Sequence, residues 1–463
     1  FRVQFRFVYE VASRISKNNL TAYLDGTYND YVNIDSSIHI RRISQQPVEF
    51  SHYVLRGVQM IICNIVLIVL TIIPIIFFNS LLFALLFVML LPPVILTAYV
   101  TKKRLTSLRQ SGRKYRERSM QYLQEALSGY IESNVYHRKD FFIDRYQYFQ
   151  GKFNAGLSEH QVMQNLPSRL IEVFAVFGLF LLIVFNTYIS GTGSIQVLLL
   201  GGFMAAAYKI IPGIVKILNS MEQVKTYSFT IKDLLAERRT TEEPVKQTKE
   251  PIHAVAFSFA SFGYKEDAVL SSFTMSLRKG DFAGLTGISG KGKTTVINLL
   301  LGFLEPDAGS VLMNDTITSA KERQAYWSRI SYIKQQSFFI HDSVRNNITL
   351  QEDYEKEKLA RVLRLTGVDH LLKEHPEGID TVLSENGKNI SGGQRQRIIL
   401  ARALYKDADL VILDEPFNEL DRVSEDRLLD HFRELAASGK IVLLITHNQE
   451  SLSFCNKIVS LDE

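Results

Sequence analysis

Two long uncharged runs near the start of the chain limit what it can fold into. Residues 57–78 and 81–100 contain no charged side chain, and only Asn79 and Ser80 separate them. Each run has the roughly 20 residues that a helix needs to cross about 30 Å of hydrocarbon. Buried helices of a soluble core do not come as two such runs joined by two residues. The sequence therefore predicts a helical hairpin that crosses a membrane twice, with both ends on one side.

A second pair of apolar segments lies further along the chain. Residues 173–189 and 194–207 are also uncharged, and a short Ser-Gly-Thr-Gly turn joins them. The later segment continues less cleanly through Lys209 and Pro212. We therefore expect a membrane-embedded all-α bundle with spans over residues 57–78, 81–100, 170–189 and 194–218.

The charges beside the first hairpin indicate its orientation. Residues 101–118 carry an excess of Lys and Arg over a single acid, Glu117. Such an excess next to a span is typical of the cytoplasmic side. A basic run can also bind nucleic acid, but its position against a span favours topology, so we expect no nucleic-acid partner. We place residues 101–168 in the cytoplasm.

A glycine-rich octapeptide in the second half of the chain indicates a nucleotide site. Residues 287–294, here called the phosphate loop, read Gly-Ile-Ser-Gly-Lys-Gly-Lys-Thr. The glycines let backbone N–H groups turn inward onto phosphate oxygens, and the next helix adds its positive end. We expect Lys293 to bind the β- and γ-phosphates of ATP and the Thr294 hydroxyl to bind Mg²⁺. The pattern alone occurs in many nucleotide-binding families.

A second motif narrows the family. Residues 390–394, here called the signature segment, read Ile-Ser-Gly-Gly-Gln, and Arg-Gln-Arg follows directly. This stretch resembles the signature of ABC-type ATPases, with Ile390 in place of the usual leucine. The resemblance extends over residues 253–463 and implies an α/β P-loop ABC ATPase domain that hydrolyses ATP with Mg²⁺.

The acidic residues that the resemblance requires follow in the expected order. Residues 410–413 form an apolar run that ends in Asp414 and Glu415, as a buried strand with acids at its carboxyl end would. Ligands bind at this edge of an open α/β sheet. The resemblance implies that Asp414 holds Mg²⁺ and that Glu415 polarises the attacking water.

Three further positions match the family. His447, after another apolar run, takes the place of the histidine that senses the γ-phosphate. Gln335 takes the place of the glutamine that contacts the metal and the water and faces the membrane domain. Tyr264 lies where the family stacks an aromatic ring on adenine, although Phe262 or Phe259 could take that role.

The resemblance thus implies catalytic residues Glu415, His447 and Gln335, and metal-binding residues Thr294, Gln335 and Asp414. It implies that nucleotide is bound by Tyr264, Gly287, Ser289, Gly290, Lys291, Gly292, Lys293, Thr294, Thr295, Ser391, Gly392, Gly393, Gln394 and Asp421.

Two places depart from the family pattern. Lys291 occupies a position that is more often small and uncharged, and it adds a positive charge near the phosphates. Residues 418–421 read Asn-Glu-Leu-Asp, where the family commonly has Ser-Ala-Leu-Asp. Asp421 is kept, and Glu415 is present, so we expect the site to hydrolyse ATP.

The order of the parts resembles an exporter-type half-transporter, in which six spans precede the ATPase domain. Four spans are visible, so we expect the first two to be missing before Phe1. We divide the chain into a transmembrane domain (1–235), a charged linker (236–252) and the ATPase domain (253–463). We also expect cytoplasmic helical extensions that end in short coupling helices near residues 24–36 and 136–146, which dock on the ATPase.

In this family ATP is held between the phosphate loop of one subunit and the signature segment of another. The resemblance therefore implies a second transporter half, most simply a second copy of this chain. It implies ATP-driven export or flipping by alternating access across the inner membrane, with the ATPase in the cytoplasm. An ATP-gated channel on the same scaffold is the alternative of another class, and the presence of Glu415 argues against it.

The cargo is the least specified part of the sequence. Residues 167–172 and the surrounding apolar pattern resemble bacterial exporters related to the flippase of lipid-linked oligosaccharides, which suggests such a lipid or another anionic lipid. A peptide, lipid or drug remains open. Lys209 lies roughly 20 Å into its span at 1.5 Å per residue, where a cation either faces a wet cavity that accepts an anion or extends to the interface. Cys63 and Cys455 are the only cysteines, which excludes a zinc site.

Overall fold

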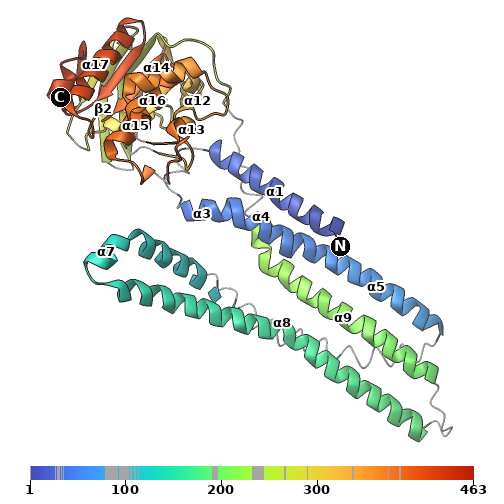
Figure 1. Cartoon of the computed structure of the whole chain (residues 1–463). Helices are drawn as coiled ribbons and strands as arrows, with labels where there is room; N and C mark the ends of the chain where they lie inside the picture. Colours follow the sequence, from blue (N-terminus) through green and yellow to red (C-terminus); the bar gives the residue numbers. More distant parts are fainter. Residues whose placement is uncertain are drawn as a thin grey trace. The chain divides into compact units, whose positions relative to one another are not determined.

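The chain forms two compact units, Phe1–Gly26 with Ile34–Thr241, and Thr27–Asn33 with Glu242–Glu463. The first is helical and the second contains both helices and strands (Figure 1). The structure is a computed structural model, and it describes residues 2–26, 28, 32, 34, 36–78, 92, 104, 107–108, 111–112, 114–189, 197–231, 245–264, 267–288, 290–335, 338–373, 375–384 and 387–462. Ser289, most of the predicted span 81–100 and much of the predicted linker lie outside the described residues.

Four long helices dominate the N-terminal unit. They are α1 (Arg2–Leu24), α5 (Arg56–Phe78), α8 (Lys139–Ile189) and α9 (Val197–Tyr227). Shorter helical segments accompany them: α3 (Ser36–Ile40), η1 (Arg41–Gln45), α4 (Gln46–Glu49), η2 (Phe50–Leu55) and α7 (Tyr130–Val135). Residues 114–128 are also helical. The coupling helix predicted near residues 136–146 is not a separate helix, because α8 begins at Lys139 and continues without a break.

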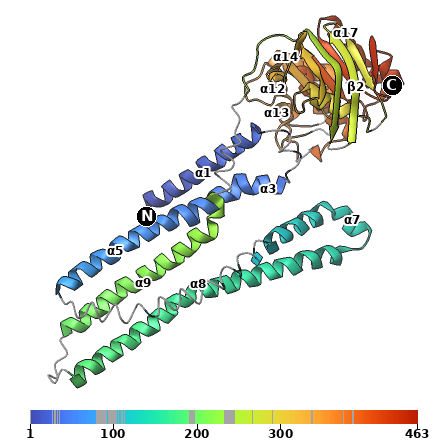
Figure 2. The same cartoon turned by 180° about the vertical axis from the view of Figure 1, so that it is seen from behind.

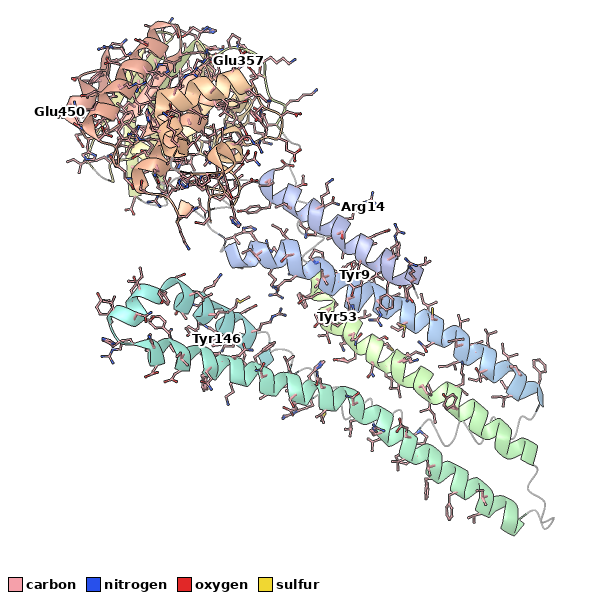
Figure 3. The ribbon with its side chains drawn as sticks, viewed as in Figure 1. Tyr9, Arg14, Tyr53, Tyr146, Glu357 and Glu450 are labelled. Atoms are coloured by element: carbon pink, nitrogen blue, oxygen red, sulfur yellow. The ribbon has the colours of Figure 1, made fainter. Side chains whose placement is uncertain are left out.

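Helices α5 and α9 lie side by side (Figures 1 and 2). Glycine allows the close approach at two points, since a Cβ atom on Gly57 would lie 2.7 Å from Val224 and one on Gly213 would lie 3.1 Å from Ile68. At the end of this contact, Tyr53 stacks on Tyr227 with ring centroids 4.0 Å apart (Figure 3 labels Tyr53). Small residues and stacked rings therefore fix this helix pair.

The apolar run within α5 has large side chains exposed on the outside of the unit. Ile62, Leu70 and Phe77 are all exposed, Phe77 at 88%. Within the described part of the chain, Ile38–Phe77 is the one helix whose length and composition suffice to cross a membrane, with a mean hydropathy of 3.0 over its apolar window. A core helix of a soluble protein or a signal sequence can meet the same criterion. Helices α8 and α9 contain residues 170–189 and 197–218 of the other predicted spans.

Two sheets form the C-terminal unit. An antiparallel sheet has the order β2 (Asp267–Arg278), β1 (Ala254–Tyr264), β4 (Ala308–Met313), β5 (Thr316–Ile317). A parallel sheet has the order β6 (Ile330–Ile333), β7 (Leu410–Asp414), β8 (Ile441–Ile445), β3 (Phe282–Thr286), β9 (Lys457–Ser460). Strands β7 and β8 are buried at every residue, which is why they read as continuous apolar runs.

Helices cover the parallel sheet and leave two cores. One core lies between the sheets and includes Phe257, Leu285 and Ile412, together with α11 (Lys293–Leu300). The other includes Ile398, Leu413 and Phe432 and lies under the remaining helices. Figure 2 shows β2 and α12–α14 on different sides of this unit. Besides α11, the helices of this unit are α12 (Ala320–Gln324), α13 (Val344–Thr349), α14 (Lys356–Thr366), α15 (Val368–Lys373), α16 (Gly392–Tyr405), α17 (Arg422–Ala437) and α18 (Gln449–Leu452).

Candidate ATP site

Three neighbouring parallel strands end at the site. Strand β8 pairs with β3 on one side and with β7 on the other, all in parallel. The phosphate loop follows β3, Asp414 closes β7, and His447 comes two residues after β8. Parallel strands present their carboxyl ends at one edge of a sheet, and ligands of α/β proteins bind in the crevice there. Residues more than 150 positions apart in the chain therefore share one edge.

The phosphate loop is shaped by glycine and held by a carboxylate. Gly292 has a φ of 92°, and a Cβ atom there would lie 2.9 Å from Val269, so a side chain does not fit. The Asp462 carboxylate accepts a hydrogen bond from the backbone N–H of Ile288 at 3.0 Å. The Lys293 ammonium donates to the carbonyl oxygens of Gly287 at 2.5 Å and of Ile288 at 3.2 Å.

This loop fits a bound phosphate group. Lys293 is also the first residue of α11, so its cation and the positive end of the helix lie together. The Thr294 side chain is exposed beside it, whereas Thr295 is 5% exposed, which leaves only its backbone to reach a phosphate. Lys291 is exposed within the loop.

Glu415 lies at the centre of a hydrogen-bonded group, here called the Glu415 cluster. Its Oε2 accepts from the Gln335 amide at 2.8 Å and from the Asn418 amide at 2.9 Å. Its Oε1 is 3.4 Å from Nδ1 of His447. Burial favours the neutral acid, but these hydrogen bonds and the nearby imidazole hold the pKa of Glu415 below its ordinary value. The carboxylate is therefore ionised at neutral pH and aimed by its neighbours.

The backbone at Glu415 is unusual for a residue with a side chain. Its φ is 48°, in the left-handed region, and its N–H donates to the carbonyl of Ile445 on β8 at 3.0 Å. Such conformations cost free energy and occur often at functional sites. This turn is what brings residue 418 back towards the carboxylate of residue 415.

Asp414 differs from its neighbour in its environment. It is 8% exposed, and burial raises its pKa to about 6, with the negative charge of Glu415 adding to the effect and the Lys293 cation opposing it. The Tyr332 hydroxyl donates a hydrogen bond to the Asp414 carboxylate, and burial raises the pKa of that tyrosine. The Asp414 carboxylate is an oxygen donor of the kind that binds Mg²⁺ together with phosphate oxygens.

The signature segment forms the start of α16. Ser391 caps this helix: its hydroxyl accepts from the N–H of Gln394 at 3.3 Å, and the Gln394 side chain accepts from the N–H of Ser391 at 2.8 Å. Glu419 lies directly over the first helical residue, since a Cβ atom on Gly392 would fall 1.2 Å from Oε2 of Glu419. A Cβ atom on Gly393 would lie 2.9 Å from the Glu419 carbonyl oxygen.

The remaining predicted residues occupy varied positions. Asp421 caps α17 by accepting from the N–H of Ser424 at 2.9 Å, and it pairs with Arg397 at 3.1 Å. Tyr264 closes β1, is 48% exposed, and contacts the half-buried Phe262 edge to face at 5.0 Å. Gly287 and Gly290 both have positive φ.

The phosphate loop and the signature segment make separate contacts among the described residues. Among the described residues, the hydrogen bonds of Ser391 and Gln394 stay within their own helix turn, and Gly392 and Gly393 face Glu419. The phosphate loop contacts Val269 and Asp462 instead. No hydrogen bond or ion pair between described residues joins the two motifs.

An aromatic contact joins a short segment from the N-terminal part of the chain to the rest of the C-terminal unit. Tyr28 belongs to the segment Thr27–Asn33 of this unit, and its ring stacks on Phe303 with centroids 4.9 Å apart. Asn298 donates to the Tyr28 hydroxyl at 3.4 Å, and Phe303 also packs against Trp327. Tyr28 lies within residues 24–36, where a docking helix was predicted.

Residues 270–418 match the family model for ABC transporters. This part of the chain is an ABC transporter ATP-binding domain. Over 99% of its length the chain superposes on a solved structure titled "Structure of a bacterial Atm1-family ABC exporter with ATP bound", with a TM-score of 0.84, 16% identity and 81% of that chain covered. The fold is therefore that of an ABC exporter half, and the predicted fold class is confirmed.

Curated relatives include transporters with lipid cargo in their names. The chain is 29% identical over 362 residues to the ATP-dependent lipid A-core flippase of Alkalilimnicola ehrlichii, a match that covers 74% of this chain and 59% of the relative. It is 28% identical to the same flippase of Paraburkholderia xenovorans, over 73% of this chain and 58% of the relative. A probable ABC transporter ATP-binding/permease protein of Haemophilus influenzae is 30% identical over 44% of this chain and 37% of its own length. The chain thus spans less than two thirds of the flippases that it matches.

Sequence analysis did not identify several contacts at the site. The departure at residues 418 and 419 was visible, but the hydrogen bond from Asn418 to Glu415 and the position of Glu419 over Gly392 were not predicted. The hydrogen bonds of Tyr332 to Asp414 and of Ile288 to Asp462 carried no local signal, because each joins residues far apart in the chain.

Proposed function

We propose that this chain is one half of an ATP-driven exporter or lipid flippase. The Glu415 cluster is the observation that carries the proposal. The Glu415 carboxylate is ionised, is oriented by an amide and an imidazole, and lies next to a buried acid. Such a carboxylate is suited to polarise a water for attack on a phosphate. The exporter fold supplies the membrane part on which hydrolysis would act.

Different residues of the site would bind the phosphates, the attacking water, the metal and the base. Lys293 and the N-terminus of α11 would hold the phosphates, and Glu415 would accept a hydrogen bond from the attacking water while Gln335 and His447 fix its direction. Thr294 and Asp414 would hold Mg²⁺, which neutralises phosphate charge when bound. Tyr264, or Phe262 beside it, offers a ring for the base.

A second copy would complete the site, because no hydrogen bond or ion pair between described residues joins the signature segment to its own phosphate loop. We infer a homodimer in the inner membrane in which two nucleotides are held between the ATPase domains. Residues 1–235 would form the membrane part, residues 236–252 the linker and residues 253–463 the cytoplasmic ATPase. Closure of the ATPase pair on ATP would turn the membrane cavity outward, and hydrolysis would reopen it.

An amphipathic anionic lipid is the proposed cargo. Two relatives carry the name lipid A-core flippase, which supports a lipid with a polar anionic headgroup. Lys209 is exposed on α9 and would provide a cation for such a headgroup. A lipid-linked oligosaccharide has the same chemistry and remains within this class.

The test is transport by the full-length protein. It would be reconstituted into vesicles with anionic glycolipids, with lipid-linked oligosaccharide or with neutral phospholipid alone, and ATP hydrolysis and lipid movement would be measured. We expect ATP-dependent movement of an anionic lipid and faster hydrolysis in its presence. Hydrolysis without any lipid movement would contradict the cargo, and the absence of hydrolysis that depends on Glu415 would contradict the function itself.

A further inference from the structure

Two charged residues at the ATP site stand where the family usually has small neutral ones. Lys291 lies in the phosphate loop and Glu419 lies two residues before Asp421. They carry opposite charges, and both side chains are exposed, Glu419 at 55%. Among the described residues of its own motif, neither charge has an ion-pair partner. The presence of both charges at one site therefore needs a physical explanation.

Glu419 is part of the surface that would receive a phosphate. Its carboxylate lies over Gly392, at the positive end of α16. The Gln396 side chain accepts a hydrogen bond from the backbone N–H of Glu419 at 2.7 Å, which fixes this segment to α16. Its ion pair within the chain is long, at 3.9 Å to Arg395. An exposed carboxylate at this place would repel the γ-phosphate of an incoming nucleotide unless a cation accompanies that nucleotide.

Lys291 would be the cation that accompanies the nucleotide. It lies two residues before Lys293 in the loop that holds the phosphates, so any phosphate that reaches a signature segment arrives together with Lys291. In the proposed two-subunit site the loop of one chain faces the signature segment of the other, so the contact is between two chains. Under the two-fold symmetry of a homodimer, the same pair forms at both nucleotides.

We infer that Lys291 of one protomer forms an ion pair with Glu419 of its partner when ATP closes the dimer, and that the partner is a second copy of this chain. The inference rests on the proposed two-subunit site and adds a contact across it that selects a second copy of this chain as the partner. A chain that carries both members of the pair is complementary to itself. A partner with small residues at both positions would leave Glu419 facing the phosphates without its cation, which disfavours it.

Cysteine cross-linking of the full-length protein in lipid tests this directly. In a background with Cys63→Ser and Cys455→Ser, Lys291→Cys and Glu419→Cys would be combined, and Glu415→Gln added to prolong the closed state. We expect a disulfide-linked dimer of twice the chain mass with ATP and Mg²⁺, and little without ATP. The matched control pairs Lys291→Cys with Glu434→Cys, an exposed position on α17, and should form little disulfide-linked dimer with or without ATP.

Charge reversal gives a second measurement that does not depend on disulfide geometry. Lys291→Glu should raise the ATP concentration for half-maximal turnover about tenfold, and adding Glu419→Lys should recover most of this loss, as for close interfacial charge pairs. A disulfide within one chain would overturn the pairing. So would a double variant whose ATP concentration for half-maximal turnover rises by the product of the two single effects. If the parent still hydrolyses ATP through Glu415 in that case, the proposed function stands without it. If the parent shows no such hydrolysis, both fall.

Discussion

At the scale of single residues, the proposed catalytic carboxylate of Glu415 has a neighbour that the family pattern does not supply. Asn418 donates to Glu415 at 2.9 Å, beside Gln335 at 2.8 Å. Asn418→Ala should slow turnover about tenfold, since a hydrogen bond to a charged group contributes about 1.4 kcal/mol. ATP binding should be unchanged, because Asn418 contacts no phosphate-loop residue among those described. Turnover within about twofold of the parent rate would mean that Asn418 does not position Glu415.

Lys209 allows a residue-scale test of the cargo. Lys209→Ala should abolish the stimulation of ATPase activity by an anionic lipid and leave the basal rate near that of the parent, because the residue lies in the proposed membrane part and outside the ATP site. Lys209→Arg should retain part of the stimulation, since charge matters more than shape for a point contact. Lys216→Ala, exposed seven residues along the same helix, is the control and should keep the stimulation. Intact stimulation in Lys209→Ala would rule out contact between Lys209 and cargo.

The sequence identifies those site residues that lie within short local motifs. Lys293 follows from its loop, and Asp414 with Glu415 follows from an apolar strand that ends in acids. The contacts of Asn418 and Glu419 could not be predicted, because they depend on the left-handed turn at Glu415. A backbone conformation of that kind is unusual for glutamate and has no sequence pattern of its own.

At the scale of elements, the start of α16 is both a helix cap and a proposed nucleotide contact. Ser391→Ala removes the hydroxyl that accepts from Gln394, at a cost of about 1 kcal/mol. Amide hydrogen exchange in the first turn of α16 should then accelerate about fivefold, whereas Ser391→Thr should preserve the cap. The first turn of α17, capped by Asp421, serves as the internal control. Unchanged exchange in Ser391→Ala would show that the cap does not stabilise this turn.

The segment around Tyr28 allows a test of the predicted docking of residues 24–36 on the ATPase domain. Tyr28→Ala removes the stacking on Phe303 and should reduce the stimulation of ATPase activity by cargo while basal hydrolysis continues. Tyr28→Phe keeps the ring and should retain most of the stimulation, because its hydrogen bond from Asn298 is long at 3.4 Å. Full stimulation in Tyr28→Ala would exclude a role for this contact in coupling.

Elements were predictable where the sequence is continuously apolar. Strands β7 and β8 coincide with apolar runs, and α5 with the uncharged run at residues 57–78. The order of the sheet was not predictable in detail, since β9 pairs with β3 from the far end of the domain. The stacking of Tyr28 on Phe303 likewise joins segments about 270 positions apart, and no local periodicity records it.

At the scale of the whole molecule, the account requires that two copies close on ATP and reopen on hydrolysis. The measurement that tests this most directly compares the full-length protein with its Glu415→Gln variant in lipid. Turnover, bound nucleotide and the association of the two ATPase domains would be followed together. The amide keeps the size and the hydrogen-bonding neighbours of the side chain but cannot polarise the water as a carboxylate does. We predict that the variant binds ATP, accumulates as a closed dimer with unhydrolysed nucleotide, and loses turnover by at least about a hundredfold. Hydrolysis within about threefold of the parent rate, or ATP binding without closure, would contradict the account.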